Sequence, residues 1–342
     1  MTVVNVAESS ANIHYLGRRN VLIGLGVAVA AGVVGGIWWW EMPHYPLVYR
    51  GHTAGVNGVA WSPDSAQLAS ASDDGTVQLC DAANGGQLLA YKGHFLRVNG
   101  VAWSPKGTRI ASGGNDLTVQ IWNAADGKNA VSYKGHTGPI KAVAWSPDGM
   151  RLASAAADHT VRIWNVTTGQ LLTSYRGHTD IVNSVAWSPD GQRLASAAAD
   201  RTVQVWKADS GEVLLTHREV VATVNTVGWS PDGMRLASGS TDQTVQIWNA
   251  STGEKILSYG GNAGAVAMLA WSPDGKKIAS AHNTVLTPAN STVQVWDAAN
   301  GQELLRYQGH TGLINAVAWA PNGKYISSAS DDDTVQIWAA VQ

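Results

Sequence analysis

The chain has 342 residues, of which 45% are hydrophobic and 14% are charged, and its formal net charge at pH 7 is −2. So low a charged fraction, together with 37 Gly and 16 Trp, excludes an intrinsically disordered protein and a coiled coil. The near-neutral charge argues against nucleic-acid binding, which needs a concentrated basic surface. The single cysteine, Cys80, excludes an intrachain disulfide and a cysteine-built metal site.

The first forty residues predict a membrane anchor. Residues 1–17 are polar and are interpreted as a cytoplasmic segment, and residues 18–40 as one transmembrane helix. Val21–Trp40 contains no charged residue, and twenty helical residues span about 30 Å, the thickness of the hydrocarbon layer. Arg18 and Arg19 mark the cytoplasmic end, and Trp38–Trp40 fit an aromatic belt at the interface. The pattern predicts a single-pass protein of the cell membrane, with the rest of the chain outside the cytoplasm.

Two other interpretations of this segment stay open. Arg18–Leu22 resembles a twin-arginine export signal, with a possible cleavage site at Ala28–Ala30. Cleavage there would leave an exposed apolar tail, so an uncleaved anchor is favoured. The other interpretation is an intracellular protein whose apolar segment only mimics an anchor. Residues 41–45 are interpreted as a linker.

Residues 51–342 consist of seven repeats. One tryptophan column has a period of 42 residues and a single interval of 48, and it comprises Trp61, Trp103, Trp145, Trp187, Trp229, Trp271 and Trp319. A second column shows the same spacing and comprises Cys80, Trp122, Trp164, Trp206, Trp248, Trp296 and Trp338. Both place a six-residue insertion in the sixth copy, around Asn283–Asn290. The repeats are predicted at 51–92, 93–134, 135–176, 177–218, 219–260, 261–308 and 309–342.

Each repeat predicts four short strands separated by turns. In the third repeat the strands are expected at Ile140–Trp145, Arg151–Ala155, Val161–Trp164 and Leu171–Tyr175. The sequence Ser-Pro-Asp-Gly between the first two is typical of a tight turn. Nothing in the repeats indicates a helix. Four strands in about 42 residues is the period of a β-propeller blade.

The repeats resemble the WD-repeat family of β-propellers. The resemblance rests on Gly-His pairs at the starts of repeats, namely Gly51-His52, Gly93-His94, Gly135-His136, Gly177-His178 and Gly309-His310. The closing Trp-Asp pair of the family occurs literally only at Trp296-Asp297. The resemblance implies an all-β fold, a seven-bladed propeller of four-stranded antiparallel blades, over residues 46–342.

The resemblance also implies how the ring closes. The seventh repeat ends after a third strand, and residues 46–50 match the pattern of a fourth strand. In the family a strand from the start of the chain completes the last blade, which pairs an otherwise open edge. Residues 46–50 are therefore predicted to be the closing strand.

The family resemblance further implies buried hydrogen-bond chains of His, Ser, Asp and Trp. Residue by residue, these are His94, Ser112, Asp116 and Trp122; His136, Ser154, Asp158 and Trp164; His178, Ser196, Asp200 and Trp206; and His310, Ser328, Asp332 and Trp338. One such set would suggest a hydrolase triad, but its repetition favours a structural role. No catalytic, cofactor or metal site is predicted, and the chain is not expected to be an enzyme.

Three repeats depart from this pattern, and their blades are expected to be less stable than the others. The first has Cys80 where the tryptophan belongs, and we interpret Cys80 as a small buried hydrophobic residue. The fifth has Val220 in place of the histidine. The sixth has Asn262 and Asn290 in place of the histidine and aspartate.

Two features of the face that carries the Gly-His loops, here the top face, are candidate partner-binding sites. One is a nearly complete ring of asparagines, Asn57, Asn99, Lys141, Asn183, Asn225 and Asn315, with Ala267 in the sixth repeat. It could bind a peptide or hydrate the channel mouth. The other is the loop Phe95-Leu96-Arg97, in which Phe95 stands where repeats one, three, four and seven have Thr. An exposed aromatic residue beside Arg is typical of interface hot spots. Drift in a duplicated loop explains it equally well.

On the opposite, bottom face, Arg109, Arg151, Arg193, Arg235 and Lys277 form a possible lipid-headgroup ring, but neighbouring aspartates largely cancel it. The short linker predicts that this face lies toward the bilayer. The sequence thus predicts a monomeric, membrane-anchored scaffold that binds a protein or peptide on its top face. The alternative is a small-ligand receptor or enzyme that uses the central channel.

Overall fold

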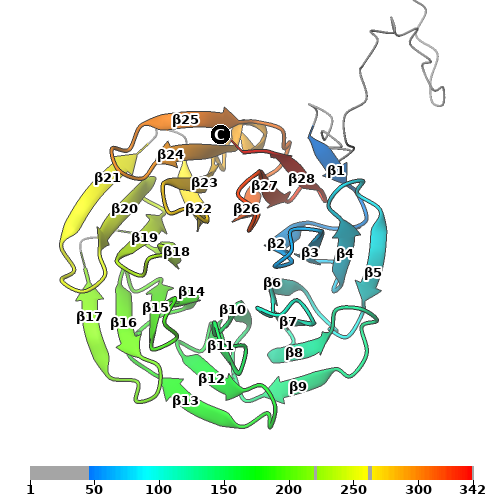
Figure 1. Cartoon of the computed structure of the whole chain (residues 1–342), viewed down its shortest axis with the longest axis horizontal. Helices are drawn as coiled ribbons and strands as arrows, with labels where there is room; N and C mark the ends of the chain where they lie inside the picture. The colour runs from blue at the N-terminus through cyan, green and yellow to red at the C-terminus, as the bar shows by residue number, and fades with distance from the viewer. Residues whose placement is uncertain (1–45, 219–221, 261–263, 341–342) are drawn as a thin grey trace, which may run out of the picture. The chain divides into compact units, whose positions relative to one another are not determined.

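The computed structural model describes residues 46–218, 222–260 and 264–340, all of them within one unit, Met42–Gln342. They form seven four-stranded antiparallel sheets arranged as the blades of a propeller, with the first strand of each blade near the centre and the fourth at the perimeter (Figure 1). This confirms the predicted seven-bladed, all-β fold.

The strands of each blade follow one another in sequence. Blade one comprises β2 (Val56–Trp61), β3 (Gln67–Ser72), β4 (Val77–Asp81) and β5 (Gln87–Tyr91). Blade two comprises β6 (Val98–Trp103), β7 (Arg109–Gly114), β8 (Thr118–Asn123) and β9 (Val131–Lys134). Blade three comprises β10 (Ile140–Trp145), β11 (Arg151–Ala156), β12 (Val161–Asn165) and β13 (Leu171–Tyr175). The four strands predicted for this repeat are therefore confirmed within one residue.

The next three blades repeat this order. Blade four comprises β14 (Val182–Trp187), β15 (Arg193–Ala198), β16 (Val203–Lys207) and β17 (Val213–His217). Blade five comprises β18 (Val224–Trp229), β19 (Arg235–Ser240), β20 (Thr244–Asn249) and β21 (Lys255–Gly260). Blade six comprises β22 (Ala265–Trp271), β23 (Lys277–Asn283), β24 (Thr292–Asp297) and β25 (Glu303–Tyr307). The six-residue insertion lies between β23 and β24 and contains a short 3-10 helix, η1 (Pro288–Asn290), which the sequence did not predict.

Blade seven closes the ring with a strand from the start of the described chain. It comprises β26 (Ile314–Trp319), β27 (Tyr325–Ser330), β28 (Val335–Ala339) and β1 (Leu47–Tyr49). β1 pairs antiparallel with β28, with Val48 opposite Gln336. The predicted closing strand is confirmed, and it covers the edge of β28 that would otherwise be open (Figure 1).

The hydrophobic core is divided into layers between neighbouring blades. Each buried cluster joins the strands of one blade to those of the next, as where Leu79 and Tyr91 of blade one meet Val98 and Trp122 of blade two. Cys80 lies in the layer between blades seven and one and is almost fully buried, which confirms the prediction. Burial raises the pKa of its thiol to about 12, so it remains protonated and packs as an apolar residue.

The first strand of every blade contains a β-bulge, which lies at the second residue of the strand in blades one to five and seven and at the third in blade six. In blade three Ile140 pairs with Ala156 and Ala142 with Ala155, which leaves Lys141 unpaired between them. The same shift occurs at Asn57, Asn99, Asn183, Asn225, Ala267 and Asn315. A bulge re-aims its side chain, so the asparagine column occupies the one position of each first strand that turns away from the regular pleat.

The predicted anchor, residues 18–40, lies outside the described residues, as do residues 1–17 and 41–45. Within the described part of the chain, no helix has the length and apolarity needed to cross a membrane.

Candidate functional site

The predicted hydrogen-bond chain is complete in blade three and joins four different elements. His136 comes from the top loop, Ser154 from β11, Asp158 from the next turn and Trp164 from β12. His136 Nδ1 lies 2.8 Å from Asp158 Oδ2, and its Nε2 lies 2.8 Å from Ser154 Oγ. Trp164 Nε1 donates to the same Ser154 Oγ at 2.8 Å. Since Trp can only donate and Asp only accept, one neutral tautomer satisfies the whole chain, with His136 donating from Nδ1 and accepting at Nε2.

Blades two and four repeat this geometry. His94 and His178 each lie 2.8 Å from their aspartate and 2.8 Å from their serine. Trp122 and Trp206 donate to those serines at 3.3 and 3.2 Å. The predictions for these two blades are confirmed.

Blade seven has only three of the four predicted members. His310 lies 2.9 Å from Asp332 Oδ2 and 2.7 Å from Ser328 Oγ. The prediction for Trp338 is wrong, because its Nε1 has no hydrogen-bond partner among the described residues. Its ring stacks on Tyr307 of blade six, with centroids 4.0 Å apart and planes 9° from parallel, as Trp122 and Trp206 stack on tyrosines of their preceding blades.

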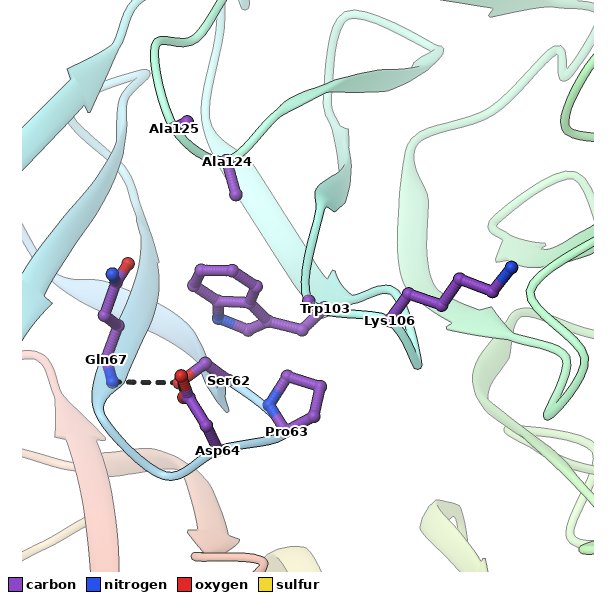
Figure 2. Close-up of a pocket in the computed structure, with 9 residues that line it drawn as sticks. Ser62, Pro63, Asp64, Gln67, Trp103, Lys106, Ala124 and Ala125 are labelled. Carbon is purple, nitrogen blue, oxygen red and sulfur yellow. Dashed lines mark hydrogen bonds between the residues drawn. The ribbon is translucent and has the colours of Figure 1, made fainter.

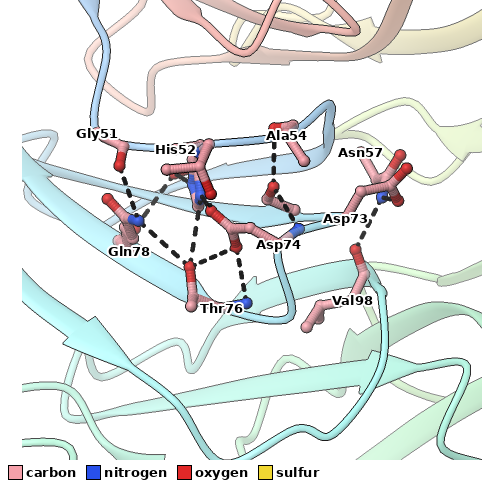
Figure 3. Close-up of polar contacts among 12 residues, drawn as sticks. Gly51, His52, Ala54, Asn57, Asp73, Asp74, Thr76, Gln78 and Val98 are labelled. Atoms are coloured by element: carbon pink, nitrogen blue, oxygen red, sulfur yellow. Dashed lines mark hydrogen bonds and ion pairs between the residues drawn. The ribbon is translucent and has the colours of Figure 1, made fainter.

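Blade one contains a chain that the sequence analysis did not single out. Figure 3 shows His52 between the top loop and the turn that carries Asp74. His52 lies 2.8 Å from both Asp74 Oδ2 and Ser70 Oγ, and Thr76 donates to Asp74 Oδ1 at 2.6 Å. The spacing of His52, Ser70 and Asp74 matches that of the other blades, so only the tryptophan is missing from this set.

Blade six restores part of the chain with a histidine from another element. His282, at the end of β23, places Nε2 2.8 Å from Ser280 Oγ, and Trp296 donates to the same oxygen at 2.8 Å. Its Nδ1 faces the carbonyl oxygen of Gly264 at 3.4 Å rather than a carboxylate. Asn262, like Val220 of blade five, lies outside the described residues.

In blade three burial favours the neutral form of His136, and hydrogen bonds favour the ionised form of Asp158. Desolvation by burial lowers the pKa of His136, although the hydrogen bond and charge of Asp158 act in the opposite direction. For Asp158, desolvation opposes ionisation, but hydrogen bonds from Thr160, the Thr137 backbone and His136 outweigh it, so its pKa lies below the usual range. In blade six burial lowers the pKa of His282 to about 4.

This arrangement does not resemble a working hydrolase triad. Ser154 is fully buried, and its hydroxyl oxygen already accepts from Trp164 while its proton is directed to His136. A nucleophile needs an approach for the substrate, and these serines have none. The same set occurs in several blades, where it joins the top loops to the sheet. Among residues 46–340 with the described gaps, no three His, Cys, Asp or Glu side chains are grouped to hold a metal ion.

The asparagine ring connects neighbouring blades. Asn57 Nδ2 donates to the carbonyl oxygen of Val98 in blade two at 3.1 Å, and to Asp73 Oδ1 at 2.7 Å (Figure 3). The equivalent bonds to the next blade are made by Asn99, Asn183, Asn225 and Asn315, at 2.6, 3.0, 2.8 and 3.1 Å. A bound peptide would compete with these bonds for the Nδ2 donors, so peptide binding by this ring stays a prediction.

Two blades lack an asparagine at this position. In blade six, which has Ala267, Asn283 at the end of β23 exchanges two hydrogen bonds with the backbone of Ile314, at 3.0 and 2.8 Å. In blade three no hydrogen bond of Lys141 to the neighbouring blade occurs among the described residues, and its side chain is partly exposed. The substitution in blade six is thus compensated, whereas that in blade three is not.

The blade-two loop, Phe95-Leu96-Arg97, projects from the top face. The exposed fraction is 91% for Phe95 and 55% for Leu96. The Arg97 side chain is 63% exposed and forms an ion pair of 3.3 Å with Asp73 of blade one. The structure therefore places an aromatic, an aliphatic and a cationic side chain together in solvent, as the sequence predicted.

A pocket of about 670 Å³ adjoins this loop. Its lining includes Phe95, Leu117, Ala130 and Lys134. Ala130 occupies the position at which blades one, three, four, five and six have Leu88, Leu172, Leu214, Ile256 and Leu304, so this outer strand has lost an aliphatic side chain. This replacement by Ala130 can be recognised in the sequence once the fourth strands of the repeats are aligned.

Comparison with known proteins agrees with this architecture. A family model described as the WDHD1 first WD40 domain matches residues 94–286, which is more than half of the chain. A second, described as WD domain, G-beta repeat, matches residues 45–81 and 301–339. No curated protein sequence matches the chain. Together with the seven four-stranded blades, these matches show that the chain belongs to the WD40-repeat family of β-propellers.

Proposed function

We propose that the chain is a protein-interaction scaffold whose partner binds the top face at the blade-two loop. WD40 propellers are usually scaffolds, and the family membership supports this general role. The partner is a protein or peptide, the propeller acts as a monomer, and the proposal includes no nucleic acid.

The observation that carries the proposal is the exposure of Phe95 and Leu96 beside Arg97. Leaving large apolar side chains in water is unfavourable, at about 25 cal/mol for each Å² of apolar surface, so their burial by a partner releases free energy. Aromatic and arginine side chains are the residues most often found at the energetic centre of interfaces. The adjoining pocket offers space for a side chain of the partner.

The proposal includes no catalysis. The His, Ser and Asp residues that could suggest a hydrolase are buried, recur from blade to blade and are engaged with one another. An enzyme or receptor that uses the central channel remains the alternative, and the capture experiment below discriminates between them.

The proposed location is the outer side of the cell membrane, with the N-terminus in the cytoplasm. Support comes from the sequence alone, in the uncharged run of residues 21–40 after Arg18 and Arg19. Export through a twin-arginine-like signal is the alternative. Membrane fractionation with a carbonate wash tests the anchor: the full chain should stay in the pellet, and its release into the supernatant would contradict anchoring.

Affinity capture from detergent-solubilised membranes of the native host tests the partner site. The native chain is compared with a Phe95→Ala/Arg97→Ala variant and with a matched control, Leu172→Ala/Arg176→Ala, which removes similar groups from blade three. We expect a protein that is lost with the first variant and kept with the second. Equal capture by all three chains would contradict the blade-two site, and capture of nothing by any chain would favour a small ligand in the channel.

A further inference from the structure

Three junctions between blades are closed on the bottom face by an arginine that covers a tryptophan. The guanidinium carbon of Arg151 lies 4.7 Å from the ring centroid of Trp187 in the next blade. Arg193 covers Trp229 at 4.7 Å, and Arg235 covers Trp271 at 4.9 Å. These are cation–π contacts, and each joins two neighbouring blades.

An aspartate lies near each of these arginines, and two of them also bond a glycine carbonyl. The aspartate of the Ser-Pro-Asp turn in the same blade lies nearby, at 3.9 Å from Arg151 and at 3.8 Å from Arg193 and Arg235. Arg151 also donates to the carbonyl oxygen of Gly191, and Arg235 to that of Gly275, each at 2.8 Å. The guanidinium site therefore consists of an indole face, a carboxylate and a glycine carbonyl.

At the junction of blades one and two, the arginine is replaced but the site around it is kept. Gln67 occupies the arginine position, directly comparable with Arg151. The three groups that hold the guanidinium elsewhere correspond here to Trp103, Asp64 and Gly107. All three line one pocket of about 250 Å³, together with Ser62, Pro63, Gln67, Lys106, Ala124 and Ala125 (Figure 2).

Trp103 differs from its counterparts in a way that agrees with a vacant site. Five of the seven tryptophans in its column donate Nε1–H to a carbonyl oxygen of the preceding blade, as Trp145 does to Ala102 at 3.2 Å. The Nε1 of Trp103 is buried and has no hydrogen-bond partner among the described residues. Figure 2 shows this nitrogen on the side of the ring toward Ser62 and Asp64.

The pocket also keeps its negative charge. Hydrogen bonds from the Ser62 hydroxyl, at 2.6 Å, and the Ala66 backbone, at 3.0 Å, lower the pKa of Asp64, so the carboxylate is ionised at neutral pH. Lys106 contributes an opposite charge to the lining, but Figure 2 shows its side chain extending away from Trp103 and Asp64.

We propose that this pocket binds the guanidinium group of an arginine supplied by another polypeptide, which replaces the arginine that blade one lacks. The guanidinium would stack on Trp103, form an ion pair with Asp64 and donate to the carbonyl of Gly107. Guanidinium suits this site better than ammonium, because it is planar, stacks on aromatic faces and donates in several directions at once. The site lies on the bottom face, so it is independent of the blade-two loop on the top face.

The probe is N-acetyl-arginine methylamide, titrated into the full chain in detergent. The readout is the NMR signal of the Trp103 indole N–H, assigned by its disappearance in a Trp103→Phe variant. We expect a saturable shift of this signal, with binding about tenfold weaker for the lysine analogue and no shift with the glutamine analogue. Gln67→Arg should fill the pocket and abolish binding, whereas Gln67→Asn keeps the pocket open and should retain it.

No shift with the arginine probe, or equal shifts with the arginine and glutamine analogues, would overturn the proposal. Unchanged binding by a folded Gln67→Arg variant would also overturn it. A second arm distinguishes the source of the arginine, since the chain itself carries Arg18 and Arg19. Binding of the probe only after Arg18→Ala/Arg19→Ala would show that the chain fills its own pocket and would contradict a partner as the source.

Discussion

In blades four and six, serines at equivalent positions are hydrogen-bonded by histidines that come from different elements. In blade four His178 comes from the top loop and bonds both Ser196 and Asp200, each at 2.8 Å. In blade six His282 comes from β23 and bonds Ser280 at the same distance, but no carboxylate accompanies it. The comparison shows that the histidine that bonds the buried serine can come from a different element in another blade.

Departures from the repeat at the surface behave differently. Phe95 and Gln67 break the pattern of the other blades, and no neighbouring residue compensates for either. A buried polar group without a partner destabilises the fold, which favours compensation of substitutions in the core. A surface substitution can remain uncompensated, and it then leaves an exposed loop or an open pocket. Substitutions that disturb ring closure or the core should therefore cost more stability than substitutions at the surface.

The largest effect should come from removing the strand that closes the ring. Deletion of Leu47–Tyr49 removes the pairing with β28 and the buried Tyr49, which donates to Gln78 at 2.5 Å. We expect the free energy of unfolding to fall by more than about 4 kcal/mol, with a lower Tm for the whole ring in calorimetry. Tyr49→Phe, which removes only the hydroxyl, should have a much smaller effect. A deletion with an unchanged Tm would refute cooperative closure.

The missing carboxylate of blade six should make its stability sensitive to acid. Above pH 6.5 His282 is neutral in both states and contributes no pH dependence. Between pH 6.5 and 4 the unfolded chain binds a proton that the folded chain does not, because burial lowers the pKa of His282 to about 4. Stability should therefore fall as the pH falls, by about 3 kcal/mol from this residue.

Denaturant unfolding of the native chain and of His282→Gln, across pH 4 to 7, isolates this contribution. Other groups titrate equally in both chains, so the difference between the two curves belongs to His282. We expect the native chain to lose more stability toward pH 4 than the variant does. Parallel curves would show that His282 does not carry the acid sensitivity.

A pair of serine substitutions compares a complete hydrogen-bond chain, in blade four, with the one in blade one, which lacks the tryptophan. Ser196→Ala in blade four leaves both His178 and the buried Trp206 Nε1 without their partner. Ser70→Ala in blade one leaves only His52, because Cys80 stands where the tryptophan would be. We expect losses of about 2 and about 1 kcal/mol in urea unfolding. Equal losses would show that the tryptophan bond adds nothing.

The smallest effect should come from completing the asparagine ring. Lys141→Asn would add a hydrogen bond to the backbone of blade four, as Asn183 makes to Val224 at 3.0 Å. We expect a gain of about 0.5 to 1 kcal/mol in the free energy of unfolding. Lys141→Ala serves as the control and should give no gain. A loss of stability with asparagine would show that blade three cannot accept the inter-blade bond.

The repeat period made most of the fold predictable from sequence. Two tryptophan columns fixed the number of blades, and the pattern of residues 46–50 identified the closing strand, because both depend on local periodicity. The complete chains of blades two, three and four followed in the same way. His282 was not predicted, because it lies on β23 and not at the histidine position of the repeat, which Asn262 occupies. The repeat spacing therefore does not indicate that His282 bonds the serine.

The contacts between neighbouring blades could not be predicted from the sequence. The asparagine ring was expected to face a peptide or water, but the β-bulge at its position turns each side chain toward the next blade. Trp338 was expected to donate to Ser328, but its Nε1 has no hydrogen-bond partner among the described residues. The arginines of the bottom face were considered as a possible ring that binds lipid headgroups. In the structure, three of them stack on tryptophans of a neighbouring blade.

The most direct test of the partner site is photo-crosslinking from equivalent positions on the top face. A benzophenone amino acid replaces Phe95 in one chain, Thr137 of blade three in a second and Thr179 of blade four in a third, each expressed in the native host and irradiated. We expect an adduct with a distinct protein from position 95 and none from positions 137 and 179. Equal adducts from all three positions, or none from position 95, would contradict a partner bound at the blade-two loop.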